Sequence, residues 1–361
     1  MIVSSKSMGK SKKLSENEER ILYGQVRFPL LNDRELADTL DFKMTTLTAI
    51  KNRLKKNGYI SKLRIPMFNK FDCELLQVSF GSAFPFEPTS DMWKFIHQSD
   101  RTKPRCFLAL KDLHQNLYLQ VFKNYTEANR INDRFQKSIG KFRFYDEAGF
   151  KRLLFPYQLA RDTNYFDYGD VLKQTFGITD KVMRGGNQET KKTSRPVKIS
   201  KLDKKILYGL VKYPSLADSS ICKKIKTTRQ AVARMRKKLE TEGIMKTVKI
   251  PNLGMMGYRL FVLFSITLDS NKNKQVLKEG MNKISEIMPP VFQISSDIKN
   301  VHLSAFQDFE HYQKATNEVY SFFTEKELFA QAPVSIPFSM PTSKSSFKLD
   351  YSGVIKNILG V

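Results

Sequence analysis

Cysteine and long apolar runs are scarce in this sequence. The three cysteines, Cys73, Cys106 and Cys222, are too few and too far apart for a disulfide framework or a CxxC metal pair. The longest apolar run, 260–268, has about nine residues, whereas a membrane span needs about twenty. The segment 1–13 lacks the apolar region of a secretory signal. We therefore expect a cytoplasmic protein without disulfides that does not enter a membrane.

Sequence motifs of common enzymes are missing as well. The four histidines form neither HExxH nor another i,i+4 ligand pair. The chain contains no GxxxxGKS/T, no GxGxxG and no GxSxG segment. From these absences we expect no enzyme, no metal and no cofactor.

Acidic residues are few relative to basic ones. The 361 residues include 61 Lys and Arg against 36 Asp and Glu, a formal charge of +25 at pH 7. The segment 181–249 alone holds 20 basic and 5 acidic residues, a net charge of +15. Solubility does not require such clustering of basic residues. The clustering is typical of proteins that bind a polyanion, usually nucleic acid. The 41% of hydrophobic residues is enough for buried cores and excludes extended disorder.

The chain is a duplication of one unit. Positions 15–66 align without a gap with 200–251, and the match returns at 167–173 and 350–356. Identical residues at equivalent positions include Ile-Leu-Tyr-Gly at 21–24 and 206–209, Pro29 and Pro214, Gly58 and Gly243, and Pro66 and Pro251. Chance is a poor explanation of a gapless match of this length.

The duplication predicts an α+β protein with six segments. These are a basic flexible tail (1–14), a winged helix-turn-helix (15–66), a ferredoxin-like domain with a C-terminal extension (67–178), a basic linker (179–199), a second winged helix-turn-helix (200–251) and a second ferredoxin-like domain with a C-terminal extension (252–361).

Three helices and a short strand pair open each copy. Apolar residues at helical spacing predict the first copy's helices near 18–27, 32–40 and 44–57, with strands near 59–65. Asn32 with Glu35 forms a capping box, and Asp218 and Thr228 are the predicted caps in the second copy. Gly58 and Gly243 follow the third helices, where positive φ is expected.

The remainder of each copy has the order βαββαβ of a ferredoxin-like unit. One sheet face is expected under helices and the other is left to pair with a partner. The predicted strands are 74–80, 106–110, 116–122 and 149–154 in the first copy and 259–268, 291–294, 301–306 and 327–333 in the second. The predicted helices are 91–97, 126–139, 272–287 and 308–323.

The third helix of each helix-turn-helix should enter a major groove of DNA. Its Arg and Gln side chains suit base edges, and the lysines further along suit phosphates. The first copy is less basic and richer in hydroxyl groups. The candidate DNA-binding residues are Thr228, Arg229, Gln230, Arg234, Lys237, Lys238, Lys246 and Lys249 in the second copy and Thr45, Thr46, Thr48, Asn52, Arg53, Lys62 and Arg64 in the first. Ordinary solvated helix faces are the alternative interpretation.

A winged helix joined by a short ribbon to a βαββαβ domain resembles the Lrp/AsnC family of transcription regulators in both copies. The resemblance is strongest in 200–268, through Leu-Glu-Thr-Glu-Gly-Ile at 239–244 and Leu-Asp-Lys-Lys-Ile-Leu at 202–207. The resemblance implies a DNA-binding helix-turn-helix and βαββαβ domains that dimerise and often bind small molecules such as amino acids. The family's Gly-x-x-Asp turn has lost its glycine at 111–114 and 296–299, so we assign no effector site. Family members ordinarily carry one copy and form homodimers, so two copies imply a pseudo-dimer within the chain.

The main prediction is therefore a transcription regulator that binds double-stranded DNA with its recognition helices. Further dimerisation through the sheet domains and contact with the transcription machinery stay open. One alternative is a non-specific architectural or assembly protein, in which aromatic clusters such as 165–168 contact partners instead of packing internally. Another is a fused enzyme that resembles siroheme decarboxylases, which are also built from paired Lrp-like units. Such an enzyme would use residues such as His114 and Tyr118, with His302 in the second copy.

Overall fold

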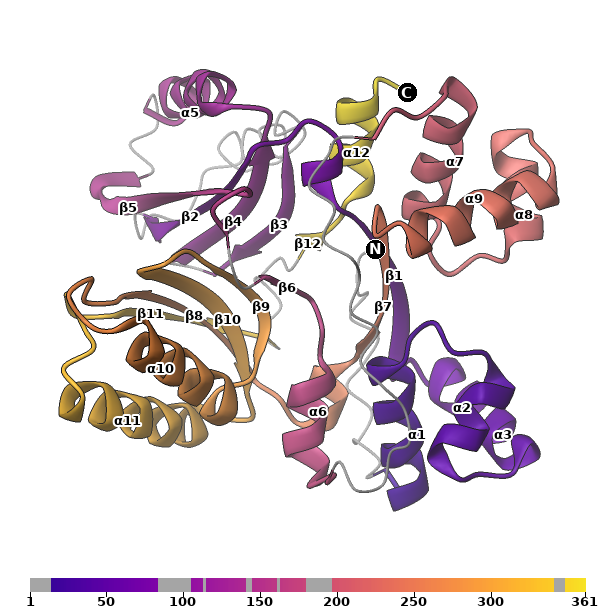
Figure 1. Ribbon diagram of the computed structural model, residues 1–361, viewed down its shortest axis with the longest axis horizontal. Coiled ribbons are helices and arrows are strands. Elements are labelled where there is room, and N and C mark those ends of the chain that lie inside the picture. Colours follow the sequence, from indigo (N-terminus) through magenta and orange to yellow (C-terminus); the bar gives the residue numbers. More distant parts are fainter. Residues whose placement is uncertain are drawn as a thin grey trace, which may run out of the picture.

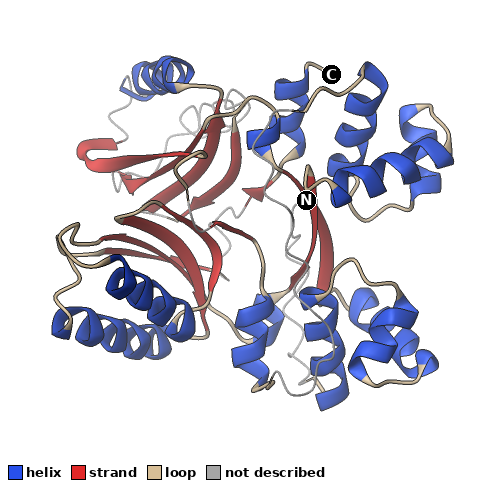
Figure 2. Ribbon diagram, in the orientation of Figure 1, coloured by secondary structure: helices blue, strands red, loops and turns tan. Residues whose placement is uncertain are grey.

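The protein is an α+β structure in which two similar copies pair with each other (Figure 1). The computed structural model describes residues 14–83, 105–112, 115–140, 145–160, 163–179, 197–340 and 348–361. Figure 2 shows two large sheets in one half of the molecule and mainly helical units in the other half. Among the helices described, none is long and apolar enough to cross a membrane.

The order of elements repeats from copy to copy. The first copy contains α1 (Glu16–Arg27), α2 (Asp33–Leu40), α3 (Met44–Lys56), β1 (Ile60–Pro66), the 3-10 helix η1 (Phe68–Lys70), β2 (Leu75–Ala83), β3 (Cys106–Lys111), β4 (Gln115–Phe122), α5 (Tyr125–Gly140), β5 (Tyr145–Pro156), β6 (Thr163–Tyr165) and α6 (Gly169–Phe176). The second contains α7 (Lys201–Lys212), α8 (Asp218–Ile225), α9 (Arg229–Thr241), β7 (Met245–Pro251), η3 (Leu253–Met256), β8 (Leu260–Thr267), α10 (Lys274–Ile287), β9 (Pro290–Ser295), β10 (Lys299–Phe306), α11 (Phe309–Glu325), β11 (Val334–Ser339), β12 (Lys348–Leu349) and α12 (Ser352–Leu359). The helix predicted at 91–97 lies outside the described residues.

Helix ends follow most of the predicted capping signals. The capping box of Asn32 and Glu35 is present, and the Thr228 side chain accepts a hydrogen bond from the backbone N–H of Ala231. Gly58 and Gly243 have φ of +76° and +62°. The prediction that Asp218 caps α8 is wrong. The N-cap is Ala217, and the Asp218 carboxylate accepts hydrogen bonds from Arg236 instead.

The strand that follows each helix-turn-helix pairs with its counterpart in the other copy. Strands β1 and β7 form a two-stranded antiparallel ribbon in which Lys62 lies opposite Lys249. The prediction of a strand pair within 59–65 is therefore wrong, because this segment supplies one strand only. Helix α1 of the first copy packs on β7, and α7 of the second packs on β1. The ribbon thus joins the two helix-turn-helix units.

Each large sheet has the ferredoxin-like strand order with one added strand from the other copy. The orders are β5-β2-β4-β3-β12 and β11-β8-β10-β9-β6, so β12 and β6 are exchanged between the copies. The strand predicted at 327–333 is wrong. Only one bridge, between Phe329 and Leu268, lies in that segment, and the strand is β11. Glu327 takes a positive φ of 50° and turns the chain after α11.

The two sheets share one apolar core. Inner-face residues of both sheets, including Val78, Leu119, Ile294 and Leu303, belong to the same buried cluster. Helices α10 and α11 cover the outer face of the second sheet (Figure 1). The segment 165–168 is also internal, because Tyr165, Phe166 and Tyr168 are all buried. Since a buried Leu or Phe side chain stabilises a fold by about 1.5–3 kcal/mol, pairing within the chain is strongly favoured.

Candidate nucleic-acid interface

Helix α9 presents one apolar and one basic face. Val232, Met235 and Leu239 recur at helical spacing and are buried against α7 and α8. The six residues predicted on and beside this helix, which we call the α9 face, are all exposed: Thr228, Arg229, Gln230, Arg234, Lys237 and Lys238. Within the described part of the chain no ion pair involves the four cations of this face. Their donors can therefore bind an external anion.

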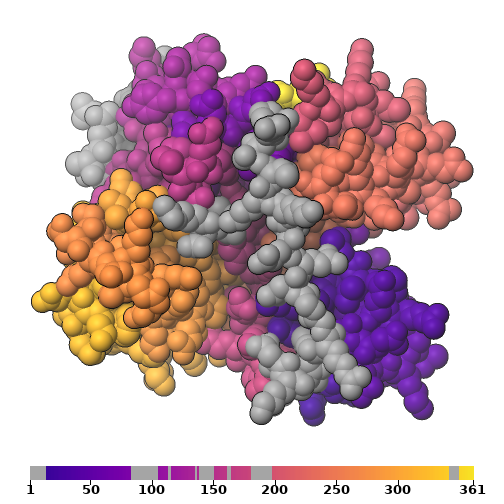
Figure 3. Space-filling view, in the orientation of Figure 1, coloured from indigo at the N-terminus to yellow at the C-terminus, as the bar shows by residue number. Residues whose placement is uncertain are grey.

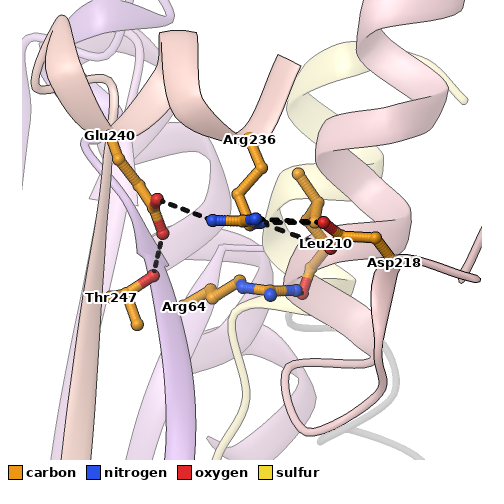
Figure 4. Close-up of polar contacts among 6 residues, drawn as sticks. All are labelled: Arg64, Leu210, Asp218, Arg236, Glu240 and Thr247. Atoms are coloured by element: carbon orange, nitrogen blue, oxygen red, sulfur yellow. Dashed lines mark hydrogen bonds and ion pairs between the residues drawn. The ribbon is translucent and has the colours of Figure 1, made fainter. Parts of the chain in front are cut away.

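A fifth cation of α9, Arg236, has a different environment (Figure 4). Its guanidinium donates to Asp218 of α8 at 3.0 Å and to Glu240 at 3.3 Å. The other Glu240 oxygen accepts a hydrogen bond of 2.6 Å from the Thr247 hydroxyl in β7. Hydrogen bonding to Asp218 raises the pKa of Arg236 above its ordinary value. The network fixes α9 against α8 and the ribbon.

This network was missed at the level of sequence. The i,i+4 spacing of Arg236 and Glu240 is a signal that could have found one of its pairs. The pairing with Asp218 depends on how α8 and α9 cross, which local spacing does not encode.

Arg64 of β1 cannot contact a phosphate, so that prediction is wrong. Its side chain crosses to the second copy, where Nη1 donates to the Leu210 carbonyl at 3.3 Å (Figure 4). The residue is 1% exposed, and its Nε has no hydrogen-bond partner among the described atoms. Burial lowers the pKa of this guanidinium. Arg64 belongs to the packing of the ribbon.

The other three ribbon lysines differ among themselves. Lys246 forms an ion pair of 3.6 Å with Asp167 of the first copy, which already balances its charge. Lys62 and Lys249 are half-buried opposite each other, and neither makes an ion pair in the described part of the chain. Burial, together with the charges of Lys51 and Lys62, lowers the pKa of Lys249 to about 8. Two opposed like charges destabilise the centre of the ribbon.

The matching face of α3 in the first copy carries little free positive charge. Thr45 and Asn52 are exposed, whereas Thr46 and Thr48 are half-buried. Arg53, the basic residue predicted on this face, pairs with Glu18 at 2.8 Å. The α3 face therefore offers mainly hydroxyl and amide groups.

The charge difference extends to the first two helices of each unit. Four acidic residues of the first copy stand where the second copy has lysine: Glu16 and Lys201, Glu19 and Lys204, Asp38 and Lys223, and Asp41 and Lys226. Figure 3 shows the two units as separate bodies with a notch between them. The segment 16–41 holds 3 basic and 7 acidic residues, whereas 201–226 holds 7 basic and 2 acidic ones, so the first two helices of the two units present opposite charge to a polyanion.

Two of the candidate residues for heme chemistry, His302 and Tyr118, lie in described parts of the chain, and both pack inside the sheet domains. His302 is fully buried, donates one 2.7 Å hydrogen bond from Nδ1 to Oδ1 of Asn300, and stacks on Phe264. Burial lowers its pKa to about 3. Tyr118 occupies the equivalent place in the first sheet and bonds to Asn116. His114 lies outside the described residues. Within the described part, no group of three His, Cys, Asp or Glu is placed to hold a metal ion.

Comparison with known proteins shows that the fold of this chain is similar to that of several solved structures. No family model and no curated protein matches the sequence. The structure of the siroheme decarboxylase NirDL is 9% identical, with a TM-score of 0.50 over 95% of this chain and 97% of NirDL. Its complex with an iron-uroporphyrin III analogue is 10% identical, with a TM-score of 0.50 over 96% and 99%. An AsnC family transcriptional regulator from Agrobacterium tumefaciens matches 41% of this chain and 95% of its own, at 20% identity and a TM-score of 0.33.

The full-length likeness corrects one expectation. We expected no enzyme, because enzyme motifs are missing from the sequence. The NirDL structures, which match nearly the whole of both chains, are those of an enzyme. The absence of local motifs therefore does not exclude an enzyme, and the paired Lrp-like architecture is one on which an enzyme is built.

Proposed function

We propose that the chain is a DNA-binding transcription regulator in which the second helix-turn-helix contacts bases and the first contributes positioning. The observation that carries the proposal is the α9 face, whose four cations are exposed and without ion pairs in the described part of the chain. In the proposed complex Arg229, Gln230 and Arg234 lie on base edges. Lys237 and Lys238 lie on phosphates.

The arrangement of the two units supports an asymmetric use of them. The Arg236 network fixes the orientation of α9, which limits the entropy lost when the helix binds. The α3 face has its arginine paired with Glu18, and α1 and α2 of this unit carry acidic residues where the second unit has lysine. A preferred DNA site need not be a palindrome when the two recognition helices differ.

Duplex binding by matched helix variants tests the proposal. Arg229→Ala/Arg234→Ala removes two cations from α9, and Thr45→Ala/Asn52→Ala changes exposed residues of α3. We expect the α9 variant to lose about 10²-fold or more in affinity for its preferred duplex. The α3 variant should lose less than about tenfold. Equal losses would contradict the division of roles, and unaltered binding by the α9 variant would contradict the proposed function.

A siroheme-decarboxylase-like activity is the second candidate. It is favoured by the likeness of fold over the whole chain and by His302, whose Nε2 is buried without a hydrogen-bond partner among the described atoms. Titration of the purified chain with an iron uroporphyrin, followed by visible absorption, tests it. A Soret shift that is lost in His302→Phe would support the activity. A spectrum equal to the sum of the separate spectra would contradict it.

A further inference from the structure

An open groove of about 640 Å³ lies between α7, the end of α8 and the end of α12, in the upper right of Figure 1. Five lysines line it, and we call it the lysine groove: Lys201, Lys204, Lys205, Lys224 and Lys226. Ile225 and Leu359 contribute apolar surface between them. None of these lysines was among the residues predicted to bind DNA.

The five lysines have no acidic partners within the described part of the chain. Lys204 donates from Nζ to the Leu359 carbonyl at 3.2 Å, and Lys224 lies 4.9 Å from the centre of the Tyr213 ring. Both contacts leave the positive charge in place. Cations gathered in one groove repel each other, and a bound polyanion relieves that repulsion.

The equivalent place in the first copy has the opposite character. Glu16, Glu19 and Asp41 stand where three of the groove lysines stand in the second copy. Arg20, the counterpart of Lys205, donates to the Leu40 carbonyl at 3.0 Å and lies over the Phe42 ring. The cluster of lysines is therefore not repeated at the equivalent positions of the first unit, and the groove belongs to the unit proposed to contact bases.

The turn between α8 and α9 links the groove to the α9 face. Lys226 is the groove residue that stands directly after α8, where it takes a left-handed φ of 54°. This turn leads within two residues to Thr228, the N-cap of α9. A duplex whose major groove receives α9 brings its backbone past this turn.

We infer, on the basis of the proposed function, that the lysine groove binds the sugar–phosphate backbone of the same duplex that α9 contacts. The lysines neutralise phosphates beyond the base-contacting residues, and the apolar surface of Ile225 and Leu359 lies against the deoxyribose faces. The groove adds affinity without adding sequence preference, because phosphate contacts carry no base information.

The test compares two triple variants of the full chain by the salt dependence of duplex binding. Lys201→Gln/Lys205→Gln/Lys226→Gln neutralises exposed lysines of the groove. Lys274→Gln/Lys278→Gln/Lys314→Gln removes the same charge from exposed positions of α10 and α11, in the second sheet domain. For the groove variant we expect the slope of log Kobs against log[salt] to become shallower by about 2–3, at about 0.9 per lost phosphate contact. Its ratio of affinities for preferred and random duplexes should stay unchanged.

The outcomes separate this inference from the proposed function. A groove variant whose slope equals that of the unaltered chain, or changes no more than that of the α10–α11 variant, overturns the inference and leaves the proposed function standing. A changed ratio between preferred and random duplexes also overturns it, since the contacts would then be base-specific. If the unaltered chain binds no duplex at near-physiological salt, this result contradicts both the inference and the proposed function. Circular dichroism and urea unfolding of each variant establish that the fold is retained.

Discussion

Arg234 and Arg236 are two residues apart on α9 and have different environments. Arg234 is exposed on the α9 face, whereas Arg236 turns inward to Asp218 and Glu240. The difference follows from helix geometry, because a step of two residues rotates a side chain to another face. Composition alone would count both as DNA contacts. Their neighbours assign one to an external partner and the other to the fold.

Arg234→Ala should weaken binding to the preferred duplex by about 1–3 kcal/mol and relax the preference at one base pair. Lys238→Ala should weaken preferred and random duplexes alike, because a phosphate contact is independent of sequence. Titration of both duplexes with each variant measures the two effects. If Arg234→Ala weakens the two duplexes by the same factor, Arg234 does not contact a base.

Arg236→Met should lower the free energy of unfolding by about 1–2 kcal/mol, because Asp218 and Glu240 lose their shared cation while staying half-buried. Urea unfolding at pH 7 measures the change. Lys51→Met in the first copy is the matched control, since Lys51 forms an ion pair with Asp33 alone in the described part of the chain. A smaller loss is expected there. Equal stability of Arg236→Met and the unaltered chain would show that the network in Figure 4 does not fix α9.

Lys249 should make stability depend on pH in the alkaline range. Its pKa is about 8 in the folded chain against an ordinary 10.5, so the unfolded state binds the proton more tightly. The resulting destabilisation is present in full below pH 8 and disappears as the pH rises toward 10.5, so stability rises over this interval. Lys249→Met should remove this rise and stabilise the chain at pH 7 by about 1–2 kcal/mol, after allowance for solvent screening. Urea unfolding at pH 7, 8, 9 and 10 checks the difference between the two chains, and a constant difference would contradict the assignment.

At the scale of elements, the sequence is most informative where the interaction is local. The helices α1, α2, α3 and their counterparts follow from apolar spacing and from caps such as Asn32 and Thr228, which act within four residues. The capping prediction for Asp218 failed because α8 begins one residue earlier than expected, so Asp218 is its first residue and its carboxylate accepts from Arg236 instead.

Elements that pair across the two copies could not be predicted in this way. The β1–β7 ribbon and the exchanged strands β6 and β12 join residues far apart in the sequence. The period-2 pattern of a strand indicates which of its faces is apolar. It does not indicate which other strand pairs with it. The burial of Arg64 and the opposed lysines 62 and 249 are direct consequences of the ribbon, so those site predictions could not be corrected before its register was known.

The turn between α9 and β7 depends on Gly243. Its φ of +62° is strained for any residue with a Cβ. Gly243→Ala should cost about 1 kcal/mol of unfolding free energy. Gly353→Ala in α12 is the control, because a Cβ there meets nothing within 4 Å and the residue is helical. Thermal unfolding should rank Gly353→Ala at or above the unaltered chain and Gly243→Ala below it, and the reverse order would contradict this account.

At the scale of the whole molecule, duplication supplies a partner within the chain and frees the two halves to differ. The sheets share one core, so the two helix-turn-helix units are held in a fixed relation. Within that relation the second unit has lysine at several positions where the first has acidic residues. The second helix-turn-helix unit (200–251) holds 14 basic and 4 acidic residues, a net charge of +10, against 10 and 7, a net charge of +3, in the first (15–66), so the positive charge is concentrated on the unit that carries the α9 face and the lysine groove.

Selection of bound duplexes from a random DNA pool at near-physiological salt tests the central claim most directly. We expect a single well-defined block of base pairs, matching α9, beside a stretch with little sequence preference. Selection repeated with Arg229→Ala/Arg234→Ala should lose that block. Two equal blocks in inverted repeat, or a pool that shows no enrichment, would contradict the claim that the second unit alone contacts bases.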